Sequence, residues 1–204
     1  MLKIAPSLLA ASVAAALSAC ASTPHRIDTE ESSPELAGRT YSDLLIIGAY
    51  EDRTFRVSAE TAFAEELKAK GITSAASYAV IPDIEILNSE TAVRDAVSTT
   101  SHDGLLTIAT LDPGYDYDYE DYMESRGLVY LLGGRPGAGT DIGSFISWAG
   151  SGAYTLHIGL WDAETLVPVW QITTDSNTTG TESGDTGALA DFVVETMRER
   201  GLVR

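Results

Sequence analysis

The sequence contains a single cysteine, three histidines and far fewer basic than acidic residues. One cysteine excludes an internal disulfide framework and any zinc or iron–sulfur site built from several thiolates. Lys and Arg number 13 against 30 Asp and Glu, so the formal net charge of the 204-residue chain is −17. A surface this negative repels phosphate groups, which makes nucleic acid a poor partner.

The motifs of common hydrolases and nucleotide-binding enzymes are also missing. Neither Gly-x-Ser-x-Gly nor His-Glu-x-x-His occurs. The stretch Gly133–Thr140 has the glycine spacing of a phosphate-binding loop but lacks its lysine, so we expect no nucleotide. A catalytic triad would need His102 or His157 to meet a serine and an acid through folding. We therefore expect no catalytic residue, no cofactor and no enzymatic activity.

The N-terminus has the pattern of an export signal. Lys3 supplies one positive charge, the apolar run 4–17 follows, and small residues lead to Cys20. This run is shorter than the roughly 20 apolar residues that span a bilayer. Leu17-Ser18-Ala19-Cys20 resembles the lipobox of bacterial lipoproteins, in which the signal is cut before the cysteine and the thiol carries a diacylglycerol. The resemblance implies a signal peptide at 1–19 and lipidation of Cys20; the alternative is an ordinary signal peptide.

The residues after Cys20 predict where the protein goes and how far it reaches. Ala21, rather than aspartate, follows the cysteine. By resemblance to enterobacterial lipoproteins, this implies the outer membrane, with the protein facing the periplasm. Residues 20–41 are rich in Ser, Thr, Pro and acidic residues, which predicts a flexible tether. About 20 residues of this kind reach roughly 65 Å when extended.

Alternating buried strands and amphipathic helices are predicted in the first half of the folded part. The run 43–50 is continuously apolar, as in a strand buried on both faces. The expected elements after it are a helix capped by Ser58 and ended by Gly71, a strand over 72–81, a helix capped by Asn88 or Ser89, and a strand over 105–109. This order predicts right-handed crossovers in a parallel or mixed sheet.

A hairpin and a helix are predicted in the second half. Apolar residues alternate from Tyr154 to Leu160, a turn follows at 162–165, and Leu166–Thr174 runs back. The indoles of Trp161 and Trp170 flank this turn and are expected to pack across it. Asp185 is the expected cap of a last helix with an apolar stripe of Leu189, Phe192, Val193 and Met197. The predicted fold class is α/β: a βαβαβ unit, then a hairpin and a C-terminal helix, with one mixed sheet. It forms a single domain over 42–204, with an insertion at about 112–152.

Several of these residues carry a family resemblance. The hairpin Leu160–Trp170, Gly71-Ile72 and Ser77-Tyr78 resemble a domain of unknown function in Gram-negative lipoproteins. The likeness covers residues 42–111 and 154–202. More distantly, the arrangement is similar to the small α/β domains of peptidoglycan-synthase activator and curli-secretion lipoproteins. No catalytic residue is carried over from the resemblance, because none is established for that family.

The insertion begins with the most unusual stretch of the chain. Tyrosine and acidic residues alternate, so an extended segment would carry aromatic side chains on one face and carboxylates on the other. Three interpretations stay open: weak calcium ligation by Asp116, Asp118 and Glu120, a charged edge that discourages strand pairing, or a partner-binding surface. Counting from Asp116, the calcium-loop pattern fails, so no metal site is predicted. The candidate partner-binding residues are Tyr115, Tyr117, Tyr119, Tyr122 and Trp148.

The sequence as a whole predicts an outer-membrane lipoprotein that works as a non-catalytic periplasmic adaptor or envelope-maintenance factor. Its expected partners are membrane lipid, through acylated Cys20, and an envelope protein. One alternative is an activator or assembly factor of peptidoglycan or secretion machinery. Others are an envelope hydrolase and a calcium- or ligand-binding lipoprotein. The acidity has a second explanation, since a high-salt habitat also favours acidic surfaces.

Overall fold

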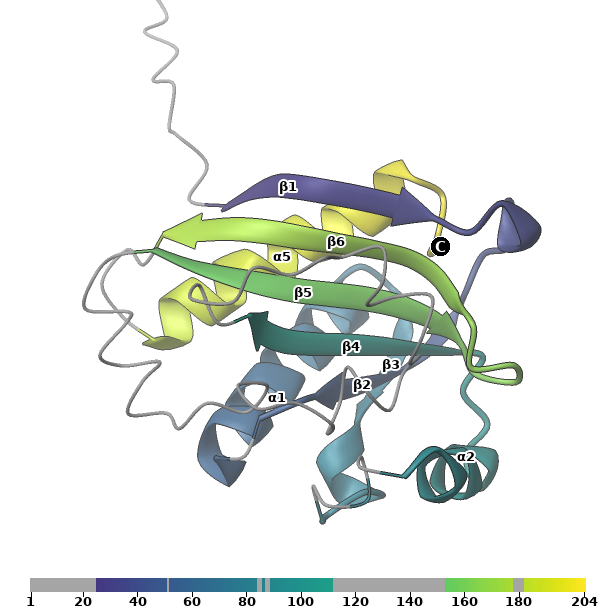
Figure 1. The fold of residues 1–204 in the computed structure, drawn as a ribbon. Coiled ribbons are helices and arrows are strands. Elements are labelled where there is room, and N and C mark those ends of the chain that lie inside the picture. Colours follow the sequence, from purple (N-terminus) through teal and green to yellow (C-terminus); the bar gives the residue numbers. More distant parts are fainter. Residues whose placement is uncertain (1–24, 51, 84–85, 87–88, 112–152, 178–181) are drawn as a thin grey trace, which may run out of the picture.

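In its described part, the chain folds around one mixed β-sheet flanked by three helices (Figure 1). The computed structural model describes residues 25–50, 52–83, 86, 89–111, 153–177 and 182–204. The strands are β1 (His25–Ser32), β2 (Asp43–Gly48), β3 (Thr73–Ala76), β4 (Gly104–Leu111), β5 (Ala153–Asp162) and β6 (Pro168–Asn177). The helices are α1 (Arg53–Ala69), α2 (Glu90–Ser98) and α5 (Glu182–Glu199), with 3-10 turns at Pro34–Leu36 and Ser77–Ala79. None of these helices has the length and apolar character needed to cross a bilayer.

The sheet order is β1-β6-β5-β4-β2-β3. β2 pairs in parallel with both β3 and β4, whereas β4, β5, β6 and β1 pair antiparallel in succession. Helices α1 and α5 cover one face of the sheet, and α2 lies on the other (Figure 1). The predicted α/β class, with a βαβαβ unit, a hairpin and a C-terminal helix on one mixed sheet, is therefore confirmed.

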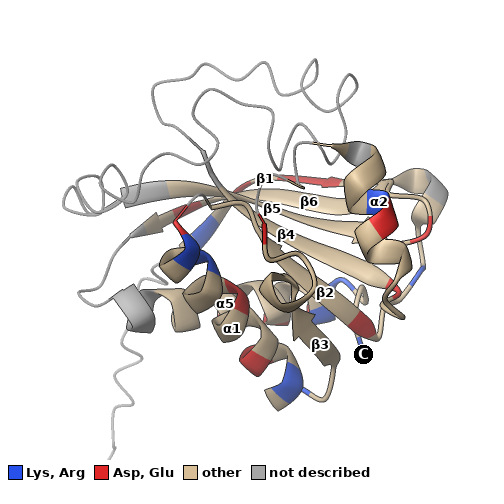
Figure 2. Cartoon of the chain, turned by 90° about the horizontal axis from the view of Figure 1, so that it is seen from below, with Lys and Arg blue, Asp and Glu red and all other residues tan. Residues whose placement is uncertain are grey.

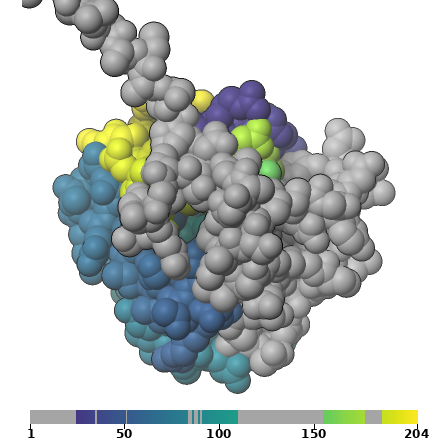
Figure 3. Space-filling model, turned by 90° about the vertical axis from the view of Figure 1, so that its left-hand side faces the viewer, coloured from purple at the N-terminus to yellow at the C-terminus, as the bar shows by residue number. Residues whose placement is uncertain are grey.

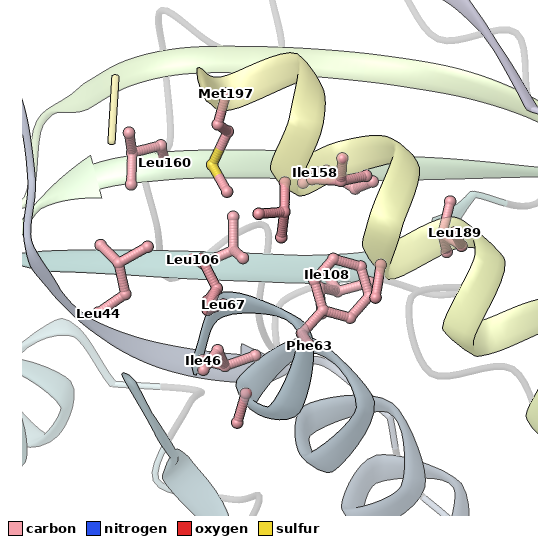
Figure 4. Close-up of a cluster of buried hydrophobic side chains, with 14 of the residues drawn as sticks. Leu44, Ile46, Phe63, Leu67, Leu106, Ile108, Ile158, Leu160, Leu189 and Met197 are labelled. Atoms are coloured by element: carbon pink, nitrogen blue, oxygen red, sulfur yellow. The ribbon is translucent and has the colours of Figure 1, made fainter. Parts of the chain in front are cut away.

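Strand β2 supplies both cores because its apolar residues alternate between the two faces of the sheet. Leu44 and Ile46 pack under α1 and α5, and Leu45 and Ile47 pack on the α2 side. All four are fully buried. Figure 4 shows the larger core, in which α1 and α5 close over side chains of β2, β4 and β5. The predicted stripe of α5 belongs to it, with Leu189, Val193 and Met197 buried and Phe192 partly buried.

The two tryptophans of the hairpin are buried but do not meet, which corrects the expected contact across the turn. Trp161 pairs with Pro168, and Trp170 pairs with Leu160, so the indoles project from opposite faces. Trp161 belongs to the α2-side core and Trp170 to the α1–α5 core. The Trp161 indole Nε1 donates to Thr107 Oγ1 at 2.9 Å, which satisfies the buried N–H.

Several boundaries differ from those that the sequence predicted. Asp52, not Ser58, caps α1, because its carboxylate accepts the Phe55 N–H at 2.8 Å. The helix ends as expected, at Lys70 and a Gly71 with φ of +84°. The strand expected over 72–81 is only β3, which gives way to a 3-10 turn at Ser77. Ser89 caps α2 as predicted, whereas Asp185 lies inside α5.

The largest correction concerns the predicted tether at 20–41. Residues His25–Ser32 form β1, which pairs antiparallel with β6 from end to end, with one irregularity between Ile27 and Thr29. A 3-10 turn follows, and Tyr41 is buried at 3% exposure beside the C-terminal Val203. Residues from His25 onward therefore belong to the fold and not to a tether. Residues 20–24 of the predicted tether lie outside the described residues.

Candidate functional site

A cleft of about 550 Å³ opens at the end of the sheet where β2 and β4 begin and β5 ends. Its lining includes both signs of charge, with Arg39, Arg94, Asp103, Asp162 and Glu164. These groups come from the segment before β2, from α2, from the turn before β4 and from the β5–β6 turn. The cleft is therefore a polar site in which arginines and acidic residues meet, on a strongly acidic chain.

Asp162 is the electrostatic centre of this cleft, although only 3% of it is exposed. Its Oδ2 accepts from the Arg39 guanidinium and from the Tyr41 hydroxyl at 3.2 Å. Its Oδ1 accepts from the Thr165 N–H at 2.9 Å and from the Thr165 hydroxyl at 2.8 Å. Burial by itself raises the pKa of this carboxyl, but the Thr165 bonds and the Arg39 charge outweigh burial and lower it. Burial and the Asp162 charge raise the pKa of Tyr41 to about 12, so its hydroxyl stays a donor.

A second pair in the cleft joins His102 to an acid. His102 Nδ1 lies 2.6 Å from Asp43 Oδ1, and the imidazole is largely buried. The neighbouring Asp103 carboxylate accepts the backbone N–H groups of Ser42 and Asp43, as well as the Ser42 hydroxyl. This arrangement fixes the turn before β4 against the start of β2.

The hydroxyl groups around His102 point to backbone acceptors. Ser98 donates to the Asp95 carbonyl at 2.8 Å and Thr100 to the Val97 carbonyl at 2.7 Å. Both bonds go to carbonyls in the last turn of α2, where backbone acceptors outnumber donors, and the Val97 carbonyl also accepts the Thr100 N–H at 2.9 Å. The Ser98 and Thr100 hydroxyls thus cap α2, and His102 Nδ1 contacts the carboxylate of Asp43.

At the opposite end of the sheet, described aromatic side chains pack beside the end of β2. In open α/β sheets, ligands commonly bind at the carboxyl ends of the parallel strands. Here Tyr50 folds back over Gly48, where an added Cβ would lie 3.0 Å from the tyrosine ring. Tyr50 also packs edge-on against Phe55, with ring centroids 4.5 Å apart.

Beneath these rings lies a buried ion pair. Arg56 and Glu60 are 3% and 0% exposed, and Arg56 Nε donates to Glu60 Oε1 at 2.8 Å. The Glu60 carboxylate also accepts from the Gly48 N–H at 2.9 Å, and from the Ser77 hydroxyl and the Tyr78 N–H at 2.8 Å each. This pair locks α1 to the end of β2 and to the turn that stops β3. It explains why the strand expected to run to Ile81 ends at Ala76.

The other two histidines are buried in strands of the sheet. His157 is completely buried in β5. His25, expected in the tether, is 2% exposed in β1, and its Nδ1 lies 2.9 Å from Ser176 Oγ. Neither lines the cleft at the amino ends of β2 and β4.

The residues that the sequence singled out in the insertion lie outside the described residues. These are the weak metal candidates Asp116, Asp118 and Glu120, and the partner-binding candidates Tyr115, Tyr117, Tyr119, Tyr122 and Trp148; Cys20 also lies outside. Within the ranges that the structure describes, no three His, Cys, Asp or Glu side chains are grouped so that they could hold a metal ion.

Sequence reasoning placed His102 and Asp103 in a turn but missed the cleft around them. One local signal was present: Asp162 stands three residues before Thr165, the spacing at which a capping aspartate accepts a backbone N–H. No signal connected Arg39 with Asp162, since 123 positions separate them.

No protein-family model matches the sequence, and the curated proteins searched contain no match. Solved structures do match. The PelC dodecamer from Paraburkholderia phytofirmans aligns with a TM-score of 0.43 and 15% identity, over 88% of this chain and 99% of that one. Lipoprotein GNA1162 from Neisseria meningitidis aligns with a TM-score of 0.39 and 12% identity, over 77% of this chain and 96% of that one. At these values, no property of either protein is transferred to this chain.

Proposed function

We propose that this chain is a bacterial lipoprotein, acylated on Cys20, which works as a non-catalytic adaptor on the periplasmic face of the outer membrane. The observation that carries the proposal is the sequence Leu17-Ser18-Ala19-Cys20 after a short apolar run, with the only cysteine of the chain at the acylation position. Acyl chains contribute about 0.8 kcal/mol per buried CH₂, so two or more chains anchor a protein stably.

The polar groups of the cleft support the non-catalytic part of the proposal. The Asp162 and Asp103 carboxylates accept hydrogen bonds that hold neighbouring segments together. The Ser98 and Thr100 hydroxyls close the end of α2. Groups used in this way build a rigid surface, which suits recognition of a partner.

The mass of the mature chain tests the anchor. We expect the membrane fraction to contain a protein that begins at Cys20 and carries the mass of its acyl chains. Cys20→Ser should leave the chain unacylated and outside the membrane fraction, while Ser22→Ala serves as the matched control. Normal acylation of the Cys20→Ser chain would refute the proposal.

Site-specific photo-crosslinking in cells tests the adaptor. Crosslinkers at Tyr117 and Trp148 probe the candidate residues of the insertion, and one at Ser98 probes the cleft. A crosslinker at the exposed Lys68, outside both, is the control. An adaptor should give one envelope protein at some probe positions and none at Lys68. The identity of the captured protein would also show whether this chain acts in peptidoglycan synthesis or in secretion. Equal capture at all four positions would contradict the adaptor function.

The Asp43–His102 pair keeps an envelope hydrolase as the second candidate, because an acid that orients an imidazole is part of hydrolytic triads. Activity-based probes that label serine hydrolases, applied to the purified protein, separate the two functions. A hydrolase would be labelled, and His102→Ala would abolish the labelling. The adaptor predicts no labelling of either chain.

A further inference from the structure

Little chain separates the predicted lipid anchor from the folded domain. Cys20 and the first residue of β1, His25, are 25 − 20 = 5 positions apart. Extended chain spans at most about 3.6 Å per residue, so the two Cα atoms are never more than roughly 18 Å apart. This limit is far shorter than the 65 Å reach expected of a long tether.

The start of β1 is fixed in the sheet and does not lengthen this connection. His25 Nδ1 lies 2.9 Å from Ser176 Oγ, and the Arg26 guanidinium donates to the Asp175 carboxylate at 2.5 Å. Further along, the Thr29 N–H donates to Thr173 Oγ1 at 3.1 Å. Releasing β1 would break these bonds together with its backbone pairing to β6.

His25 lies at the end of the sheet remote from the cleft. It pairs with Ser176 near the end of β6, whereas the other end of β1, Ser32, pairs with Trp170. Helix α5 begins after β6 finishes, and α1 begins after β2 finishes, so both helices start at the His25 end. Figure 3 looks onto this end, with parts of β1, α1 and α5 in view.

We propose that this end of the domain, defined by His25, Ser176 and the first turns of α1 and α5, rests against the phospholipid bilayer, with the cleft at Asp162 directed away from it. The inference rests on acylation of Cys20. Strand β5 has 10 residues and runs from the His25 end to Asp162, so it separates the two ends by about 33 Å.

This orientation assigns roles to the two ends. The end at which Tyr50 and Phe55 pack lies near the membrane, and the open, polar cleft is presented to the aqueous compartment. A partner in the aqueous compartment would therefore bind at the cleft or along the sides of the domain. A partner that binds the His25 end would have to lie at the membrane surface.

Energy transfer to the membrane tests the orientation. Acylation uses the only native cysteine, so a second cysteine gives a unique site for a fluorescent donor. The lipidated full chain is placed in vesicles of phosphatidylethanolamine and phosphatidylglycerol that contain a headgroup-labelled acceptor lipid. The donor is attached to Ala188→Cys, an exposed position near His25 on α5, or to Glu164→Cys, an exposed position at the β5–β6 turn.

We expect transfer to be several-fold more efficient from the Ala188→Cys variant than from the Glu164→Cys variant. Insertion of a 20-residue Gly/Ser segment between Thr23 and Pro24 is the control, because it restores a long tether. The difference between the two donor positions should then largely disappear.

The outcomes separate this inference from the function on which it rests. Acylated protein that gives equal transfer from both positions, or higher transfer from Glu164→Cys, overturns the orientation and leaves the anchor intact. Protein that carries no acyl chain by mass overturns both.

Discussion

Two arginine–carboxylate pairs stand at opposite ends of the same sheet, in different surroundings. Arg56 and Glu60 are almost completely buried at the end where β2 finishes. Arg39 and Asp162 lie at the end where β2 begins, where the Arg39 side chain is 52% exposed and that of Asp162 only 5%. Water therefore reaches one member of the second pair and neither member of the first.

This difference shows that the same chemistry serves two purposes. A buried pair must be fully satisfied, because a charge left alone in the interior costs several kcal/mol. It locks the elements around it. In the half-exposed pair, the aspartate holds the β5–β6 turn and Tyr41, while the arginine stays in contact with solvent in the cleft. Both signs of charge are also mixed along the helices (Figure 2), so the acidity of the chain does not make the described surface uniformly negative.

The largest expected effect is at the buried pair. Glu60→Gln removes the negative charge that Arg56 faces and should lower the free energy of unfolding by about 3–5 kcal/mol. Urea unfolding followed by circular dichroism measures the change. Glu65→Gln, on the exposed side of the same helix, is the matched control and should stay within about 0.5 kcal/mol of the parent. Equal effects of the two substitutions would remove the distinction between the two ends.

A smaller loss is expected at the cleft. Asp162→Asn keeps the shape of the side chain but turns one acceptor into a donor, which opposes the N–H and hydroxyl of Thr165 or the groups of Arg39 and Tyr41. We expect a loss of about 1–3 kcal/mol in the free energy of unfolding. Glu164→Gln, an exposed neighbour on the same turn, should change little. Loss equal to that of Glu60→Gln would show that the cleft is as closed as the interior.

The loss of stability at low pH should also differ between the parent protein and Asp162→Asn. Its pKa is lowered in the folded state, so its stabilisation is complete above its unfolded pKa of about 3.9 and is lost as pH falls through the folded value. Below about pH 4, the parent should therefore lose stability more steeply than Asp162→Asn, so their unfolding curves should converge. Curves that stay parallel down to pH 2 would contradict the lowered pKa.

The smallest effect is expected at the exposed partner of this pair. Arg39→Ala removes one of the groups that face Asp162, but Thr165 and Tyr41 continue to satisfy the carboxylate. Its melting temperature should drop less than that of Asp162→Asn, and the remaining effect of Arg39 should weaken in high salt. A larger drop for Arg39→Ala than for Asp162→Asn would reverse this order.

Local sequence patterns predicted the centre of the sheet well and its edges poorly. The strands β2 and β4 and the β5–β6 hairpin are visible because buried strands consist of continuous or alternating apolar residues. Strand β1 was not predicted, because it is an edge strand whose Arg26–Ser32 segment is mostly polar and exposed. Charged residues on an edge discourage pairing with other chains, and the same charges resemble those of a tether.

By itself, the sequence determined the α/β class, the order of most elements, the excess of acidic residues and the candidate acylation cysteine, because these follow from composition and local periodicity. Only the tertiary structure decided that His25–Ser32 is a strand of the sheet, that the two hairpin tryptophans face apart, and that Arg39 meets Asp162. Each of these depends on strand register or on contacts between distant segments. Local sequence patterns do not predict such contacts, because the residues that make them are far apart in the sequence and meet only in the folded protein.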